Sequence, residues 1–110
     1  MLTKHQQLLF AKQAEIAQAI GHPLRLAIID FLKDGPQCVC DIAAHIGAER
    51  SNVSRHLSVM VAAGVLERRK HGLKVIYRLK CLCILDFFTC ISGVLKNEAK
   101  ESSRLLTALR

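Results

Sequence analysis

The sequence predicts a mainly α-helical domain that carries one β-hairpin, in the order α-α-α-α-β-β-α. Three observations predict this fold. Apolar residues recur at helical spacing in four stretches before residue 64, glycines stand where those stretches end, and two β-rich runs then surround a Gly-containing turn. The chain has 110 residues, of which 51% are hydrophobic, so we expect a single folded domain over residues 1–110.

The first two helices are predicted over residues 3–20 and 23–33. Gly21 is typical of a helix C-terminus, and Pro23 suits a first helical turn, where its missing N–H costs nothing. The residues expected on the buried face of the second helix are Leu24, Ala27, Ile28 and Phe31.

A short helix and a longer one are predicted next. The short helix starts at Val39 or Cys40, runs to residue 46 and ends at Gly47, and the longer one runs from residue 50 to residue 63. The apolar set of the longer helix is Val53, Leu57, Met60 and Val61. Two such helices with a tight Gly-containing connection are the outline of a helix-turn-helix.

A hairpin and a final helix complete the predicted order. Residues 65–69 and 74–79 are the expected strands, with the turn between them. Residues 82–98 return to helical character, and residues 102–110 either extend that helix or form a separate turn.

The charge balance predicts an anionic partner. The chain has 16 basic and 9 acidic residues, a formal net charge of +7. Only 5% of its residues are aromatic, which leaves little surface for stacking exposed bases and favours duplex DNA over single-stranded RNA. The longest uncharged stretch is about half the roughly 20 residues that cross a bilayer, so we expect no membrane contact. The polar first segment predicts a cytoplasmic protein with reduced thiols.

Candidate DNA contacts lie in two places. Short polar side chains at the start of the longer helix can reach base edges and phosphates, and basic residues near the hairpin tip suit phosphates or a minor groove. The contacts expected on the helix are Ser51, Asn52, Ser54, Arg55 and His56. Those expected on the hairpin are Arg68, Arg69, Lys70 and Lys74, with His71 also facing DNA.

Five segments in this order and spacing carry a resemblance to a known family. They are GHPLRL at 21–26, CVCD at 38–41, SNVSRHL at 51–57, AGVLERR at 63–69 and VIYRL at 75–79. Residues 19–79 thereby resemble the ArsR/SmtB family of bacterial winged-helix metalloregulators, arsenic-responsive type. The resemblance implies a winged helix-turn-helix homodimer, joined through its first and last helices, that represses a resistance operon until an inducer binds.

Cys38 and Cys40 are the first candidate metal ligands, because thiolates bind soft cations. Residues two apart in a regular helix point about 200° from each other, so both sulfurs reach one ion only if the helix start is irregular. Ion capture would then distort the first helix of the DNA-binding pair. The resemblance implies As(III) or Sb(III) as the inducer and no organic cofactor, with Cd(II) or Pb(II) as the alternative.

The third ligand is left open. Ala43 stands where the arsenic-responsive pattern often has another cysteine, and residues 1–37 contain none. Cys81 and Cys83 are the further candidate ligands, because they could form a second Cys-x-Cys chelate, whereas Cys90 is expected in the core as a small hydrophobe. The last helix has no histidine, which disfavours the zinc site implied for SmtB-like members. We expect His22 and His45 to be structural.

Other functions stay open at this point. A persulfide- or redox-sensing repressor would form a disulfide between Cys38 or Cys40 and a cysteine of the last helix. A thiol enzyme would need a nucleophile motif or a glycine-rich pocket loop, and the sequence has neither, so no enzymatic activity is expected. A dimer module without DNA binding is disfavoured by the basic helix and hairpin.

Overall fold

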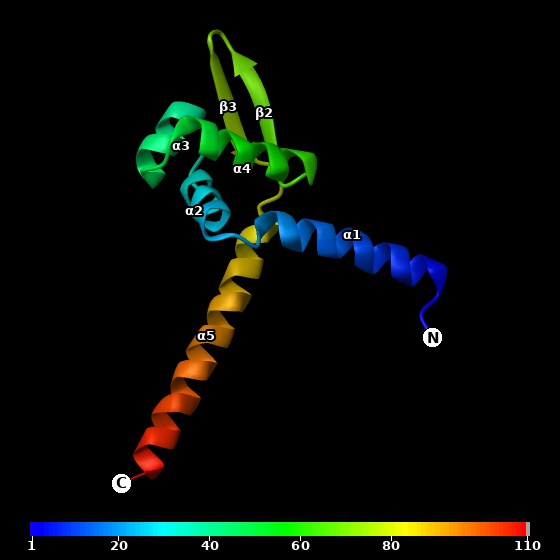
Figure 1. Ribbon diagram of the computed structural model, residues 1–110, viewed down its shortest axis with the longest axis vertical. Helices are drawn as coiled ribbons and strands as arrows, with labels where there is room; N and C mark the ends of the chain where they lie inside the picture. The colour runs from blue at the N-terminus through cyan, green and yellow to red at the C-terminus, as the bar shows by residue number, and fades with distance from the viewer. Residues whose placement is uncertain (110) are drawn as a thin grey trace.

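The computed structural model describes residues 1–109 and confirms the predicted order of helices and hairpin (Figure 1). One short strand is added before the third helix. The elements are α1 (Lys4–Ile20), α2 (Pro23–Leu32), β1 (Gln37–Cys38), α3 (Val39–Ile46), α4 (Arg50–Ala62), β2 (Leu66–His71), β3 (Lys74–Leu79) and α5 (Cys83–Ala108). The predicted bounds agree to within two residues, except that α5 continues unbroken through residue 108.

Side chains and turns fix several helix ends. Thr3 forms a capping box with Gln6 at the start of α1. His22 caps α2, because its Nδ1 accepts a hydrogen bond from the Leu24 N–H at 3.1 Å. Gly47 ends α3 with a φ of 75°, a left-handed conformation that glycine adopts without steric cost. The ring of His45 stacks on Phe31 at 4.0 Å, so the structural roles expected for His22 and His45 are confirmed.

The three strands form one antiparallel sheet in the order β1-β3-β2. The β2–β3 hairpin turns at Gly72, whose φ of 65° suits the tight connection. β1 pairs Gln37 with Tyr77 and Cys38 with Ile76. Sequence reasoning missed β1, because a strand of this length exists through its pairing with β3 and has no pattern of its own.

The core lies between α2, α3, α4 and the base of the hairpin. Its fully buried large side chains are Ile28, Ile29, Ile42, Val53, Leu57, Met60, Val65 and Leu66. The expected buried face of α2 was partly wrong, because Ala27 is exposed and Leu24 and Phe31 are half-buried. Ile29 and Leu32 are buried instead, since α3, α4 and β3 all pack against α2 and enclose more than one side of it.

Helices α1 and α5 extend away from this core in different directions (Figure 1). α1 buries only Ala19 and Ile20, and α5 has no buried residue in the chain as described. The expectation that Cys90 lies in the core was therefore wrong: α5 projects out of the protomer, and Cys90 is exposed. Within residues 1–109, none of the helices combines the length and apolar character that a membrane span requires.

Large apolar side chains are exposed along both projecting helices. On α1 they are Leu8, Leu9, Phe10 and Ile16. On α5 they are Phe87, Ile91, Val94, Leu95, Leu105 and Leu106. An apolar surface of this extent is typical of a protein–protein contact.

Candidate nucleic-acid interface and thiol site

Helices α3 and α4 form the helix-turn-helix. The inner side of α4 is held in the core by Val53, Leu57 and Met60. Its outer side carries four of the five expected DNA contacts, of which Ser51 and Arg55 are exposed and Asn52 and Ser54 are half-buried. Asn52 orients Arg55, because its Oδ1 accepts a hydrogen bond from Arg55 Nη2 at 3.2 Å. These polar groups lie together on one accessible helix surface.

His56 has a different place from the one expected. It lies on the flank of α4 that faces the junction of α1 and α2, where its Nδ1 accepts a hydrogen bond from Arg25 Nε at 3.0 Å. Its ring centroid is 4.5 Å from that of His22. The half-buried ring is thus engaged in contacts between helices, and the DNA contact expected for His56 stays a prediction.

Arg25 is the residue that sequence reasoning missed. It belongs to the GHPLRL segment but received no role, and its partner on α4 lies 31 residues away. No local spacing could reveal that pairing. The only signal was a charged residue among apolar ones on α2, which indicates a specific partner when it is half-buried.

The two faces of the hairpin differ in how their charged side chains are paired. On one face, Glu67 accepts hydrogen bonds from Arg78 Nη2 at 2.6 Å and from Arg69 Nε at 3.0 Å. These bonds, Arg78 first, lower the pKa of Glu67, so the carboxylate is ionised at neutral pH. Arg68 and Lys70 alternate with Arg69 along β2. Within residues 1–109, Arg68, Lys70 and Lys74 form no ion pair.

We expect Glu67→Gln to strengthen binding of a labelled duplex and to steepen its salt dependence. The substitution removes a negative charge from the hairpin and weakens the hold on Arg69 and Arg78. One added phosphate contact changes the slope of log K against log salt by about 0.9. Fluorescence anisotropy over a series of KCl concentrations measures both quantities, with Glu101→Gln on α5 as the matched charge control. Weaker binding would show instead that Glu67 positions these arginines for DNA.

Cys38 and Cys40 stand at the start of α3. Cys38 is the N-cap, with an extended backbone (φ −80°, ψ 159°), and its side chain is buried. Cys40 lies in the first helical turn and is exposed. Because Cys38 precedes the helix, the separation of about 200° that a regular helix imposes does not apply to this pair. The two side chains differ in accessibility, so binding one ion with both requires the Cys38 sulfur to leave the core.

Cys81 and Cys83 are joined to each other by a disulfide at the junction of β3 and α5. The expectation of reduced thiols at these positions is corrected, and neither residue is a thiolate ligand in this form, because metal binding needs the thiolate. The bond also differs from the redox pairing considered above, since Cys38, Cys40 and Cys90 are free.

The separation of the two cysteine pairs limits their cooperation within a protomer. Ile76 pairs with Cys38, and Cys81 lies five residues further on, two residues past the end of β3. At about 3.3 Å per residue, the strand from Ile76 to Leu79 alone covers roughly 10 Å, which exceeds two bonds of about 2.3 Å to one ion. Accordingly, residues 1–109 contain no cluster of three or more His, Cys, Asp or Glu side chains arranged to hold a metal.

The fold and the basic, polar surface of α4 and the hairpin define a winged helix-turn-helix protein that binds DNA. Residues 22–68 match the model of the bacterial regulatory protein family arsR. The chain is 38% identical over 64 residues to an uncharacterized HTH-type transcriptional regulator of Methanocaldococcus jannaschii, a match that covers 57% of this chain and 72% of the relative. The chain belongs to the arsR family of transcriptional regulators, and it is a repressor rather than an enzyme.

Two further similarities extend this result. An arsenical resistance operon repressor of Staphylococcus xylosus is 30% identical over 70 residues, covering 64% of this chain and 67% of that protein. The solution structure of a homodimeric winged helix-turn-helix DNA-binding domain from Mycobacterium bovis superposes with a TM-score of 0.78 at 23% identity, covering 91% of this chain and 93% of that one. The second similarity confirms the fold.

Proposed function

We propose that this repressor is a homodimer that releases its operator when As(III) or Sb(III) binds Cys38 and Cys40. The observation that carries the proposal is the position of these two thiols on either side of Val39, the first residue of α3, the helix that packs against α4. Their soft sulfur donors suit a soft metalloid. The similarity to an arsenical resistance repressor supports the same class of inducer.

Release would follow from the burial of Cys38. Each As–S bond that forms replaces an As–OH bond of arsenite, and the thiol proton leaves with that hydroxyl as water. Cys40 is accessible, whereas the Cys38 side chain is only 5% exposed and must turn outward to reach the same ion. That movement disturbs the start of α3, and Ile42 and Ala43 of α3 share the core with Val53 and Leu57 of α4. The orientation of α4 toward DNA would change with it.

The third coordination position would be filled from outside the protomer. Cys81 and Cys83 lie beyond the end of β3, so we do not expect them to share an ion with Cys38 of the same chain. A hydroxide or a cysteine of a second copy fits the remaining position. Cys90 on α5 is exposed and free to serve in this way.

The proposed dimer joins copies through α1 and α5, so residues 1–110 would form one DNA-binding domain with dimerisation helices at both ends. The exposed apolar side chains of these helices are the surface it would cover. A single helix-turn-helix reads only a few base pairs, and two symmetric copies read an imperfect palindrome at adjacent major grooves. Pairing also doubles the net charge of +7 presented to DNA.

The inducer is tested on a duplex that the wild-type protein selects from a random-sequence pool. The protein is reduced with a phosphine, which is then removed, and the labelled complex is titrated with arsenite, antimonite, cadmium, hydrogen peroxide and polysulfide in turn. Fluorescence anisotropy reports release. We expect arsenite and antimonite to release the duplex at the lowest concentrations. Release by cadmium alone would assign a different soft ion, and release by none of the metals would overturn the proposal.

A redox-sensing repressor is the second candidate, and the Cys81–Cys83 disulfide is the observation that favours it. A hydroperoxide would be reduced as the two thiols lose two protons and two electrons, leaving the disulfide, one water and an alcohol, or a second water when the oxidant is hydrogen peroxide. Release by peroxide or polysulfide, but not by arsenite, in the titration above would select this function.

We expect Arg55→Ala to weaken duplex binding by about 1–3 kcal/mol, because its guanidinium lies on the outer side of α4 where base edges would be reached. Lys74→Ala on the hairpin should mainly flatten the salt dependence, since it would contact a phosphate. Anisotropy titrations at several KCl concentrations separate the two effects. Equal losses for both variants at every salt concentration would contradict these roles.

A further inference from the structure

One side chain connects three helices at the base of the winged domain. Arg25 projects from α2, and its Nη1 donates to the backbone oxygens of Gln18 at 3.4 Å and Ala19 at 3.3 Å, in the last turn of α1. Its Nε donates to His56 Nδ1 on α4 at 3.0 Å. The same guanidinium therefore holds the end of α1 and the DNA-reading helix.

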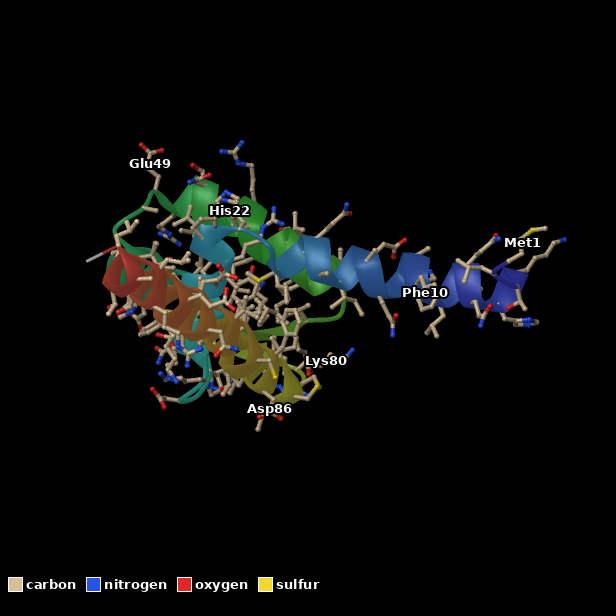
Figure 2. All side chains as sticks on the ribbon, turned by 90° about the horizontal axis from the view of Figure 1, so that it is seen from below. Met1, Phe10, His22, Glu49, Lys80 and Asp86 are labelled. Carbon is tan, nitrogen blue, oxygen red and sulfur yellow. A yellow bond between two sulfur atoms is a disulfide. The ribbon has the colours of Figure 1, made fainter. Side chains whose placement is uncertain are left out.

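His22 fixes the other side of the His56 ring. Its Nδ1 is occupied by the Leu24 N–H, which caps α2, and its ring lies against His56 at 4.5 Å between centroids with an angle of 45°. Figure 2 shows His22 where α1 gives way to α2, beside α4. The ring of His56 is thus held between a capped helix start and a guanidinium.

We propose that Arg25 is a positioning residue for DNA reading: through the unprotonated Nδ1 of His56 it holds α4 against the end of α1, and protonation of His56 releases that hold. The inference rests on the proposed function, in which α4 reads DNA and α1 joins the dimer. It assigns the orientation of the reading helix to a contact between helices.

The chemistry of the contact requires a neutral His56. A guanidinium has only donors, so it needs the lone pair of Nδ1, and a doubly protonated imidazole offers none. Burial lowers the pKa of His56, and the neighbouring His22, Arg25 and Arg55 lower it further. His56 is therefore neutral at pH 7, and the contact is present above its folded-state pKa and lost as the pH falls through it.

The charged groups around this contact also disfavour a proton on His56. His22 and Arg25 face His56 from α2, and Arg55 precedes it on α4. From α1, Lys12 and Glu15 line the groove that also includes Arg25, so α1 contributes one charge of each sign there. A proton on His56 would meet mainly positive neighbours, which favours separation of α4 from α2.

Three variants test the proposal, all in a His71→Asn background that removes the histidine at the hairpin tip. His56→Asn keeps an acceptor oxygen near the position of Nδ1 but does not titrate. His56→Phe keeps a ring without an acceptor, and Arg25→Lys keeps the charge but loses the forked donor geometry. Duplex affinity is measured for each from about pH 5.5 to about pH 8, which spans the ordinary histidine range.

We expect the background protein to lose affinity toward the acidic end, and His56→Asn to bind as tightly at every pH as the background does at high pH. His56→Phe and Arg25→Lys should bind about tenfold more weakly at high pH, with little further change on acidification. Circular dichroism melts check that each variant folds. If His56→Phe matches the background in affinity and pH profile, the positioning role is overturned. If the background protein itself binds no duplex, the proposed DNA reading by α4 fails instead.

Discussion

Arsenite is expected to release the wild-type protein from its duplex and to leave the Cys38→Ser and Cys40→Ser variants bound. Repression needs only the folded helix-turn-helix and hairpin, so both variants should bind the duplex like the wild type when no inducer is present. Release needs both thiolates, because a serine supplies a hard, protonated oxygen that soft ions bind poorly. In both variants, the arsenite concentration that gives half-release should rise by at least about a hundredfold, which corresponds to about 2.7 kcal/mol.

The control for these variants is Cys90→Ser, which removes an exposed thiol of the same chain. It should release normally if hydroxide fills the third position. A higher arsenite requirement for Cys90→Ser, Cys81→Ser or Cys83→Ser would instead identify the residue that a second copy supplies. If both the Cys38 and the Cys40 variants release the duplex at the arsenite concentration that releases the wild type, the inducer site lies elsewhere in the protein.

Ile91→Glu is expected to separate the dimer and to reduce duplex affinity by at least about a hundredfold. Ile91 is 41% exposed on α5, so the substitution leaves the core of the protomer intact but places a charge within the apolar surface that the partner would cover. A monomer offers one helix-turn-helix and half the positive charge, and both effects weaken binding. Sedimentation velocity measures the assembly state, and anisotropy measures the affinity.

Thr89→Glu is the matched control for Ile91→Glu. Residues two apart on a helix point about 200° from each other, so this variant adds the same charge on the opposite side of α5. It should remain dimeric and bind DNA with nearly wild-type affinity. Dissociation by both variants, or by neither, would contradict an interface on the apolar side of α5.

The helices and hairpin could be predicted from the sequence because their signals are local. Gly47 and Gly72 stand where the backbone takes a left-handed conformation, and Val53, Leu57 and Met60 repeat at helical spacing. The strand at Gln37–Cys38 could not be predicted, because it depends on a partner in β3. The buried face of α2 was partly missed for the same reason, since elements distant in the sequence enclose it.

The candidate site was predictable in residue type and less so in arrangement. The polar surface of α4 follows from helical spacing, which places Ser51, Asn52 and Arg55 opposite the core. The place of His56 does not follow, because it is set by Arg25 on another helix. The state of Cys81 and Cys83 depends on a covalent bond between their side chains, and the exposure of Cys90 depends on how far α5 projects.

The central claim is that soft-metalloid capture at Cys38 and Cys40 and DNA binding oppose each other. It is tested most directly by titrating the reduced protein with arsenite, free and saturated with duplex, while following the sulfur-to-arsenic charge-transfer absorption. Coupling between two ligands is reciprocal, so arsenite should weaken duplex affinity by the same factor by which the duplex weakens arsenite affinity. We expect equal factors of at least about tenfold for the wild type, and no absorption that depends on the duplex with Cys38→Ser or Cys40→Ser. Identical arsenite affinities for the free and DNA-bound protein would contradict the claim.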